Sequence, residues 1–173
     1  ARRLGIDAGG LKLSPRNVEG VVEMMLDATQ KFDAPLTTER LFGWHAALFP
    51  TGRNGMSAIR VGAWRDDREG PMQVLSGPVG KARVHFQAPA ASRLKREIRA
   101  FLAWFNGKDP IDAVLKAGVA HLWFVTIHPF DDGNGRIARA IADMALARSE
   151  SSPQRFYSMS AQIRLERKAY YDH

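Results

Sequence analysis

Residues 124–143 read "FVTIHPFDDGNGRIARAIAD". An apolar run ends at His128, and Pro129 cannot continue a helix. Two aspartates and a Gly-Asn-Gly bend follow, and Arg136 and Arg139 then open an amphipathic pattern. The stretch therefore predicts two helices joined by a turn that gathers a base, carboxylates and fixed positive charges.

The chain has 173 residues and no cysteine. A domain of this length buries enough surface to fold without disulfides, and the absence of cysteine excludes a cysteine nucleophile and any thiolate metal site. It is consistent with a reducing compartment, and we expect a cytoplasmic protein. The longest apolar run, "AGVAHLWFVTI", is too short to span a bilayer and contains His121, and no signal peptide is visible, so no membrane association is expected.

The formal net charge of +7 would suit nucleic acid, nucleotide phosphates or acidic partners. The charges alternate with acidic residues along the predicted helices, as on a solvated surface, and no basic helix or aromatic ladder is present. Nucleic-acid binding is therefore not expected. Because the chain starts without methionine and ends within a helical pattern, we interpret residues 1–173 as a single domain of a longer protein.

Helical periodicity dominates the chain. It predicts helices over residues 18–32, 37–49, 92–106, 109–127, 135–149 and 158–171. The helix over 109–127 is largely apolar in its second half and is expected to be central, and Trp44, Trp104 and Trp123 are expected in the core. Residues 5–17 and 50–57 are predicted to be loops because they are rich in glycine.

One region departs from the helical pattern. Residues 58–64, 72–77 and 81–89 have strand-like patterns, and "GPVG" at 77–80 is typical of a hairpin turn. We therefore predict a mainly α fold with a short β-hairpin region over residues 58–88.

The turn contains the candidates for chemistry. His128, at a helix end beside a polar loop, is placed to act as a general base, although a lone histidine is more often structural. The bend at Gly133, Asn134 and Gly135 leads into a helix start, where free backbone N–H groups form an anion site. The alternative is a simple N-cap turn made by Asp132 or Asn134.

Arg136 and Arg139 lie one helical turn apart, so both face that anion site. Arginine forks suit phosphate, and positive charge is unfavourable at a helix N-terminus unless an anion binds there. The alternative is two ordinary surface arginines. Asp132 beside a phosphate is a typical Mg²⁺ ligand. The spacing fits neither an EF-hand, nor a zinc site made by His121 and His128, nor a P-loop. These residues together indicate Mg²⁺-nucleotide chemistry.

The motif "HPFDDGNGR" followed by "IAR", residues 128–139, resembles the signature of the Fic domain family, His-Pro-Phe-x-Asp/Glu-Gly-Asn-Gly-Arg-x-x-Arg. Every defined position is filled. The stretches "LFGWHAALFP", "GPMQVLSG", "VHFQAP" and "YSMSAQI" also look like a bacterial Fic subgroup. The resemblance implies a helical domain with a β-hairpin flap before the signature. It also implies transfer of AMP from ATP to a Ser, Thr or Tyr hydroxyl of a target protein.

The resemblance assigns a role to each signature residue. By it, His128 accepts the proton of the target hydroxyl, Asp132 holds Mg²⁺, Arg136 and Arg139 bind the β- and γ-phosphates, and Phe130 anchors the loop in the core. The anion hole would be formed by Gly133, Asn134 and Gly135.

The flap implied by the resemblance would hold the target as an added strand, near residues Val74, Leu75, Ser76 and Gly77. Gly135 argues against the Doc-type branch, which carries lysine there and transfers the γ-phosphate. A CDP-choline-using branch stays open.

Two further elements are expected by resemblance. Similar proteins carry an inhibitory Ser/Thr-x-x-x-Glu-Gly/Asn helix. Here Glu19 and Gly20 follow Pro15 at the hydroxyl position, so we interpret this match as a coincidence. In similar proteins the motif lies on an upstream helix, which residues 1–173 would lack, and whether such a helix precedes them is left open. The last predicted helix would place residues near the adenine, or simply pack against the bundle: Gln162, Tyr170 and Tyr171.

Three hypotheses follow for the function. The first is AMP transfer to a protein, with self-modification and a homodimer as open possibilities. The second is a nucleotide-binding regulatory module without turnover, which would not need His128. The third, a nucleic-acid-binding domain, lacks the basic surface it would need.

Overall fold

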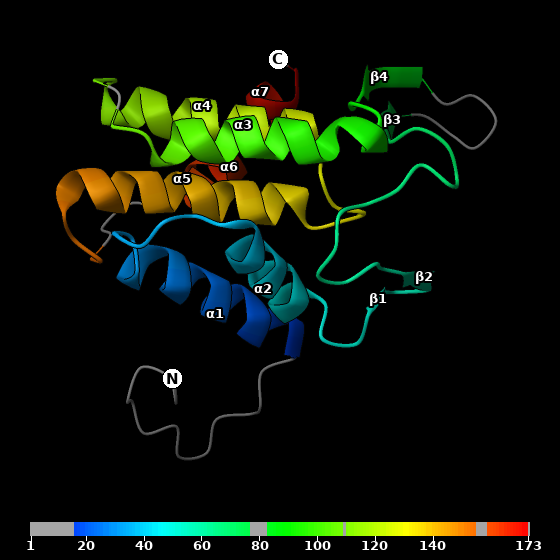
Figure 1. The fold of residues 1–173 in the computed structure, drawn as a ribbon, viewed down its shortest axis with the longest axis horizontal. Coiled ribbons are helices and arrows are strands. Elements are labelled where there is room, and N and C mark those ends of the chain that lie inside the picture. The colour runs from blue at the N-terminus through cyan, green and yellow to red at the C-terminus, as the bar shows by residue number, and fades with distance from the viewer. Residues whose placement is uncertain (1–15, 77–82, 109, 155–158, 173) are drawn as a thin grey trace.

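Helix α5, Asn134–Glu150, lies at the centre of a helical bundle in the computed structural model, which describes residues 16–76, 83–108, 110–154 and 159–172 (Figure 1). It contacts α1 (Arg16–Gln30), α2 (Thr38–Leu48), α4 (Ala113–Ile127) and α6 (Met159–Leu165). Its buried positions include alanines at 138, 140, 142, 145 and 147. Because alanine is small, neighbouring helices can approach α5 from several sides.

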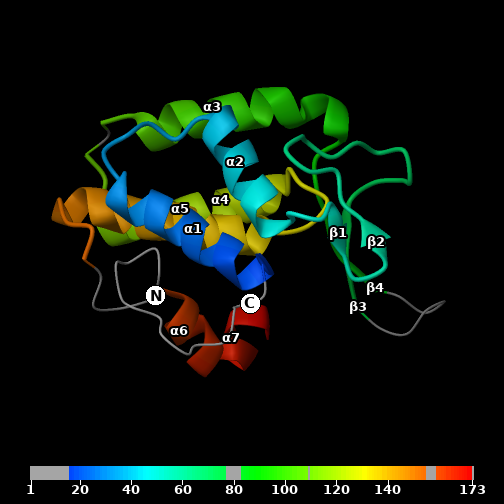
Figure 2. The ribbon, with the colours of Figure 1, turned by 90° about the horizontal axis from the view of Figure 1, so that it is seen from below.

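The other helices form layers around α5. Helix α3 (Leu94–Asn106) packs on α4, and Figure 1 shows α5 between this pair and the α1–α2 pair. Figure 2 shows α6 and α7 (Arg167–Asp172) on the side of α5 away from α3. No helix in the described ranges is long and apolar enough to cross a bilayer.

The predicted mainly α class with a β-hairpin is confirmed, but the helix over 109–127 is not the central one. Helix α4 begins at Ala113, where Asp112 caps the N–H groups of Val114 and Leu115. One face of α4 packs on α5, while Leu115 and Leu122 on the other face are more than half exposed. The apolar character of α4 therefore reflects an exposed stripe as well as a buried one.

Aromatic and aliphatic side chains from every layer fill the core. The largest fully buried ones include Phe101, Phe105, Phe124, Phe130, Leu41 and Ile141. Trp44 is buried as expected, and Trp104 and Trp123 are partly buried against the core.

Two small antiparallel hairpins lie at the end of the bundle where α4 leads into α5 (Figure 1). Strand β1 (Arg53–Asn54) pairs with β2 (Ser57–Ala58), so residues 53–57 of the predicted loop form most of a small hairpin. Strand β3 (Gln73–Ser76) pairs with β4 (Arg83–Gln87), with a bulge between Val74 and Leu75. The β3–β4 pairing confirms the predicted hairpin strands, and its "GPVG" turn lies outside the described residues.

The predicted strand over 58–64 is wrong beyond Ala58. Gly62 has a φ of 64°, which no extended strand allows, and its N–H donates to Nδ1 of His45. The side chains of Ile59, Val61 and Trp64 pack against the core instead of alternating across a sheet. Tertiary contacts therefore overrule the strand-like pattern.

The predicted helix over 158–171 is two helices. Helix α6 ends at Leu165 and α7 begins at Arg167, with Glu166 between them.

Helices α1 and α2 cross very closely at Gly20. A Cβ at this position would lie 1.8 Å from the carbonyl oxygen of Ala47 on α2, so only glycine fits there. This close approach explains Gly20 by packing. Glu19, beside it, is exposed in the first turn of α1.

We predict that Gly20→Ala destabilises the fold by about 2–3 kcal/mol, because backbone must move to admit the methyl group. Gly43→Ala in α2 is the matched control, since a Cβ added at that position would meet nothing within 4 Å. The control should stabilise the helix by up to about 1 kcal/mol. Urea unfolding of both variants measures the difference, and equal effects would contradict the close crossing.

Candidate active site

The turn between α4 and α5 is built on two left-handed residues. His128 caps α4 with φ 49° and ψ 57°, and Gly133 precedes α5 with φ 83°. The left-handed conformation costs a non-glycine residue about 1–2 kcal/mol. A Cβ at Gly133 would also lie 3.0 Å from Phe49, so this position excludes other residues both by conformation and by contact.

Asn134 closes the turn from inside the protein. Its Oδ1 accepts from the N–H of Phe130 at 3.0 Å, and its Nδ2 donates to the Phe130 carbonyl at 2.8 Å. Phe130 itself is fully buried, as expected, and its ring stacks on His45 and contacts Trp64. The side chain of Asn134 is thus committed to holding the turn, and only its backbone N–H faces the helix start.

The hydrogen bonding of His128 decides which of its ring nitrogens is basic. Nδ1 lies 3.2 Å from the carbonyl oxygen of Val125, which can only accept, so Nδ1 carries the proton. Nε2 is then left with its lone pair. Burial lowers the pKa of His128, the Val125 carbonyl and Asp132 oppose the shift, and the charge of Arg65 adds to it. The imidazole is therefore neutral and able to accept a proton at neutral pH.

Asp132 is held by groups from three places. Its Oδ2 accepts from Asn54 of the β1–β2 hairpin at 2.6 Å, and its Oδ1 accepts from the N–H of Gly133 at 2.5 Å. Arg136 approaches Oδ2 at 3.7 Å. Among the described residues no three side chains gather as a metal site, so Asp132 would be a lone protein carboxylate beside bound phosphate.

The first two turns of α5 present both arginines. The guanidinium of Arg136 lies over the ring of Phe49, 4.8 Å from its centroid. The guanidinium of Arg139 lies close to the backbone of Gly135, since a Cβ built there would be 3.5 Å from its Nη1. Both cations sit at a helix start with free N–H groups, an arrangement that attracts an anion.

His45 supports the turn from α2. Its Nδ1 accepts from the N–H of Gly62, and its Nε2 donates to the carbonyl oxygen of Asp132. Both bonds exist only in the neutral ring with the proton on Nε2. Burial lowers the pKa of His45, against the opposing effects of the Asp132 carbonyl and of the charges of Asp131 and Asp132.

Arg65 is a buried cation beside the turn. Its Nε donates to the carbonyl oxygen of His128 at 2.7 Å, and its backbone N–H donates to that of Pro129 at 2.9 Å. Its side chain also binds Asp67 and the carbonyl oxygen of Pro89, at the end of the β3–β4 hairpin.

The residues predicted for target and adenine binding lie on peripheral elements. Val74, Leu75 and Ser76 are exposed on β3, and Gly77 lies outside the described residues. Tyr170 on α7 lies 2.7 Å from Nε2 of His121, and Gln162 on α6 donates to Glu166. Tyr171 belongs to α7, but its side chain lies outside the described part. Nothing in these contacts tests the predicted roles.

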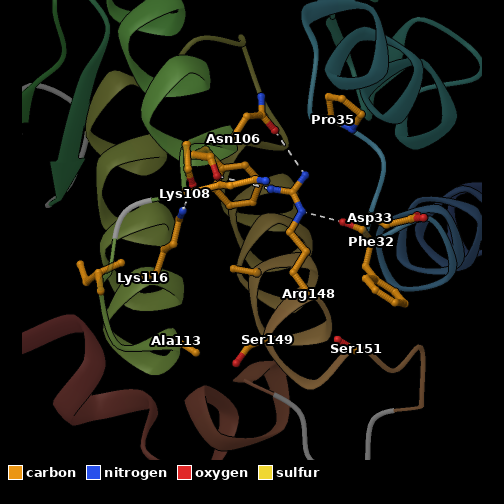
Figure 3. A pocket seen from close by; sticks show the side chains of 14 residues that line it. Phe32, Asp33, Pro35, Asn106, Lys108, Ala113, Lys116, Arg148, Ser149 and Ser151 are labelled. Atoms are coloured by element: carbon orange, nitrogen blue, oxygen red, sulfur yellow. Dashed lines mark hydrogen bonds between the residues drawn. The ribbon is translucent and has the colours of Figure 1, made fainter.

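A cavity of about 710 Å³ lies at the opposite end of α5 from the turn (Figure 3). Figure 3 shows Arg148 there, donating to the carbonyl oxygen of Phe32 and to Oδ1 of Asn106. Arg148 also donates to the carbonyl oxygen of Ala34. Burial lowers the pKa of Arg148 to about 10. Phe32 and Ala34 follow the end of α1, and Asn106 ends α3. Arg148 therefore links these two segments at the end of α5 away from the turn.

Residues 35–146 match the model of the Fic/DOC family. The chain belongs to the Fic/DOC family. The match includes the whole signature at 128–139 and the hairpin region, so the predicted resemblance is confirmed.

Relatives in the family have curated names. The chain is 39% identical over 67 residues to a protein adenylyltransferase Fic of Nematostella vectensis, covering 38% of this chain and 16% of that protein. It is 29% identical over 133 residues to a uridine 5'-monophosphate transferase of Xanthomonas campestris, covering 69% of this chain and 22% of that protein. The matched part is thus less than a quarter of either relative.

A solved structure shares the fold. A Fic domain-containing signaling protein from Bacteroides thetaiotaomicron superposes with a TM-score of 0.63 at 23% identity, covering 82% of this chain and 53% of that one. A Fic family protein from Desulfovibrio desulfuricans gives 0.57 at 21% identity, covering 83% of this chain and 41% of that one. At this identity the likeness concerns the fold alone.

Sequence reasoning missed three supports of the turn: His45, Asn54 and Arg65. His45 lies in a predicted helix, Asn54 in a predicted loop and Arg65 just after the predicted strand over 58–64. None was given a site role, because the partner of each is far away in the chain. A buried position for the histidine of "GWHAALFP" was the one available signal, because its neighbours on the helix are apolar.

We predict that Asn134→Ala costs about 2–4 kcal/mol of unfolding free energy, because it leaves the buried N–H and C=O of Phe130 unpaired. Asn54→Ala is the control, since Asn54 is exposed and its loss should cost less than about 0.5 kcal/mol. Urea denaturation distinguishes them. A small, equal loss in both variants would show that Asn134 does not hold the turn.

We also predict that acid destabilises the fold through its buried histidines. The pKa values of His45, His121 and His128 are all lowered, so the unfolded chain, with a histidine pKa of about 6.5, binds protons first. The free energy of unfolding should be highest above that pH. It should fall as the pH drops toward the pKa values of these histidines in the folded chain. Urea unfolding at about pH 7.5 and about pH 5.5 measures the loss. The loss should be smaller in His45→Gln, and a flat profile in the parent chain would contradict the prediction.

Proposed function

We propose that this chain transfers AMP from ATP to a hydroxyl side chain of a target protein. The observation that carries the proposal is the contact of His128 Nδ1 with the carbonyl oxygen of Val125, at 3.2 Å. Because Nδ1 donates to the carbonyl of Val125, Nε2 is the basic atom at the entrance to a helix start flanked by two arginines. A base beside a phosphate-attracting helix start is what attack of a hydroxyl on a nucleotide phosphorus requires.

In the proposed reaction the hydroxyl oxygen of the target bonds to the α-phosphorus of ATP. The bond from that phosphorus to the oxygen of the leaving pyrophosphate breaks, and the hydroxyl proton moves to Nε2 of His128. Backbone N–H groups at the start of α5 bind the negative oxygens, and Arg136 and Arg139 pair with the leaving phosphates. Catalysis is then mostly positioning and neutralisation of charge.

Asp132 is the residue proposed to hold Mg²⁺. Its carboxylate lies partly exposed beside the start of α5, and Asn54 and Gly133 fix its two oxygens. When bound with nucleotide, the ion would neutralise phosphate charge.

The β3–β4 hairpin is proposed to hold the target. A groove of about 840 Å³ runs between β3 and residues 57–60 and reaches Asp131, next to the proposed metal ligand. Leu75 of β3 lines it, while Val74 and Leu75 are exposed. Since β3 pairs with β4 alone among the described residues, its other edge can pair with an extended target segment.

A second nucleotide donor is favoured by one comparison. The Xanthomonas relative is named a uridine 5'-monophosphate transferase and aligns over more of this chain than the adenylyltransferase does. The phosphate-binding part of the site would serve UTP as well as ATP, because it contacts no base. Phosphate or phosphocholine transfer and a regulatory module without turnover are the remaining alternatives.

In the deciding experiment, the chain is incubated with a mixture of proteins and Mg²⁺. Each reaction contains one labelled donor: α-labelled ATP, γ-labelled ATP or α-labelled UTP. Label from α-ATP should enter protein, and label from γ-ATP should not. His128→Ala should reduce the transfer by about 100-fold or more, since the base is lost. Transfer activity in His128→Ala equal to that of the parent chain would contradict the proposed mechanism.

The other donors decide the alternatives. Label only from UTP would replace AMP by UMP as the group transferred, and label only from γ-ATP would make the chain a kinase. Nucleotide binding without any transfer, in the presence of Mg²⁺, would support the regulatory module.

A further inference from the structure

Arg65 connects three segments: the turn at His128, the loop at Asp67 and the residues after β4 at Pro89. The proposed reaction requires the turn and the β3–β4 hairpin to keep fixed relative positions. The Arg65 guanidinium binds the carbonyl oxygen of His128 at 2.7 Å, that of Pro89 at 2.5 Å and Oδ1 of Asp67 at 2.8 Å. The side chain is completely shielded from solvent, so these bonds compete with no water. A buried arginine with three oriented acceptors is held rigidly.

The contact to His128 acts on the one left-handed non-glycine residue of the turn. Nε of Arg65 holds the His128 carbonyl, and the backbone N–H of Arg65 holds the Pro129 carbonyl. Two successive peptide oxygens are therefore fixed by one residue. By fixing the backbone of His128, these bonds also fix the direction in which its side chain points.

The other contacts act on the β3–β4 hairpin. Pro89 follows the end of β4, and Asp67, which pairs with Arg65, also accepts from the N–H of Ala91 at 2.6 Å. The strands themselves are largely exposed, so this network is a main attachment of the hairpin to the bundle.

We propose that Arg65 is a positioning residue that fixes the distance between the His128 base and the hairpin that holds the target. The inference rests on the proposed function. Arg65 touches neither nucleotide nor target. It acts through the peptide of His128 on one side and through Pro89 and Asp67 on the other.

The charge of Arg65 has a second consequence. Burial is the largest cause of the lowered pKa of His128, and the Arg65 cation lowers it further, while Asp132 raises it. These two charged groups are the ones that act on His128 within the described part of the chain. Removing Arg65 should therefore raise the pKa of His128.

The test compares Arg65→Met and Arg65→Lys with Arg148→Met. Arg148 is the matched control, because it is a partly buried arginine that also donates to backbone carbonyls, at the far end of α5 (Figure 3). Thermal unfolding first establishes that each variant is folded. Transfer kinetics and nucleotide binding then separate positioning from stability.

In Arg65→Met we expect kcat to fall about 100-fold while the affinity for nucleotide stays unchanged, because the base and the target are misplaced but the start of α5 is intact. Arg65→Lys should recover part of kcat, since one donor and the charge remain. Arg148→Met should lower only the melting temperature. Equal kcat in Arg65→Met and the parent chain, or equal losses in both methionine variants, would overturn the proposal.

A readout without turnover keeps this test separate from the proposed function. The ring resonances of His128, assigned by their loss in His128→Ala, can be titrated by NMR in each variant. The midpoint should rise in Arg65→Met and stay in place in Arg65→Lys and Arg148→Met. If the parent chain transfers no nucleotide, the proposed function fails, and an unmoved midpoint in Arg65→Met would separately overturn the positioning role.

Discussion

The two hydrogen bonds from the buried amide of Asn134 to the backbone of Phe130 are the constraint on which the site depends. They close the turn on itself, so Phe130 can fill the core while Asp131, next to it, is exposed. Because these bonds favour the closed turn, they help the left-handed residues on either side to keep their conformation. The start of α5, Asp132 and His128 are thereby held close together.

Side chains and N–H groups from outside the motif donate hydrogen bonds to the carbonyl oxygens of the turn. His45 donates to the carbonyl of Asp132, and Arg65 donates to those of His128 and Pro129. A turn of this shape points its carbonyls inward, where each needs a donor. The surrounding helices and loops supply these donors, and this satisfies the buried polar groups while fixing the outward-facing N–H groups.

The sequence allowed the helices and the signature to be predicted, because both depend on residues close together in the chain. Amphipathic periodicity located the six helical regions, and the motif at 128–139 placed His128, Asp132 and the two arginines close together in the chain. The supports could not be predicted in this way. Arg65 is separated from His128 by 63 positions and His45 from Asp132 by 87, so only the folded chain brings them together. The strand expected at 58–64 failed for the same reason, since long-range contacts to the turn decide its shape.

Trp64 is placed to serve as an intrinsic fluorescent probe of the turn. Its ring lies 4.5 Å from that of Phe42 and 5.0 Å from that of Phe130, centroid to centroid, at the base of the site. The other tryptophans of the chain, Trp44, Trp104 and Trp123, have no ring contact with Phe130 among the described residues. Replacing those three by phenylalanine would leave a chain whose intrinsic fluorescence reports the closure of the turn in real time. The same aromatic packing that holds the loop shut thus makes its opening visible without any added dye.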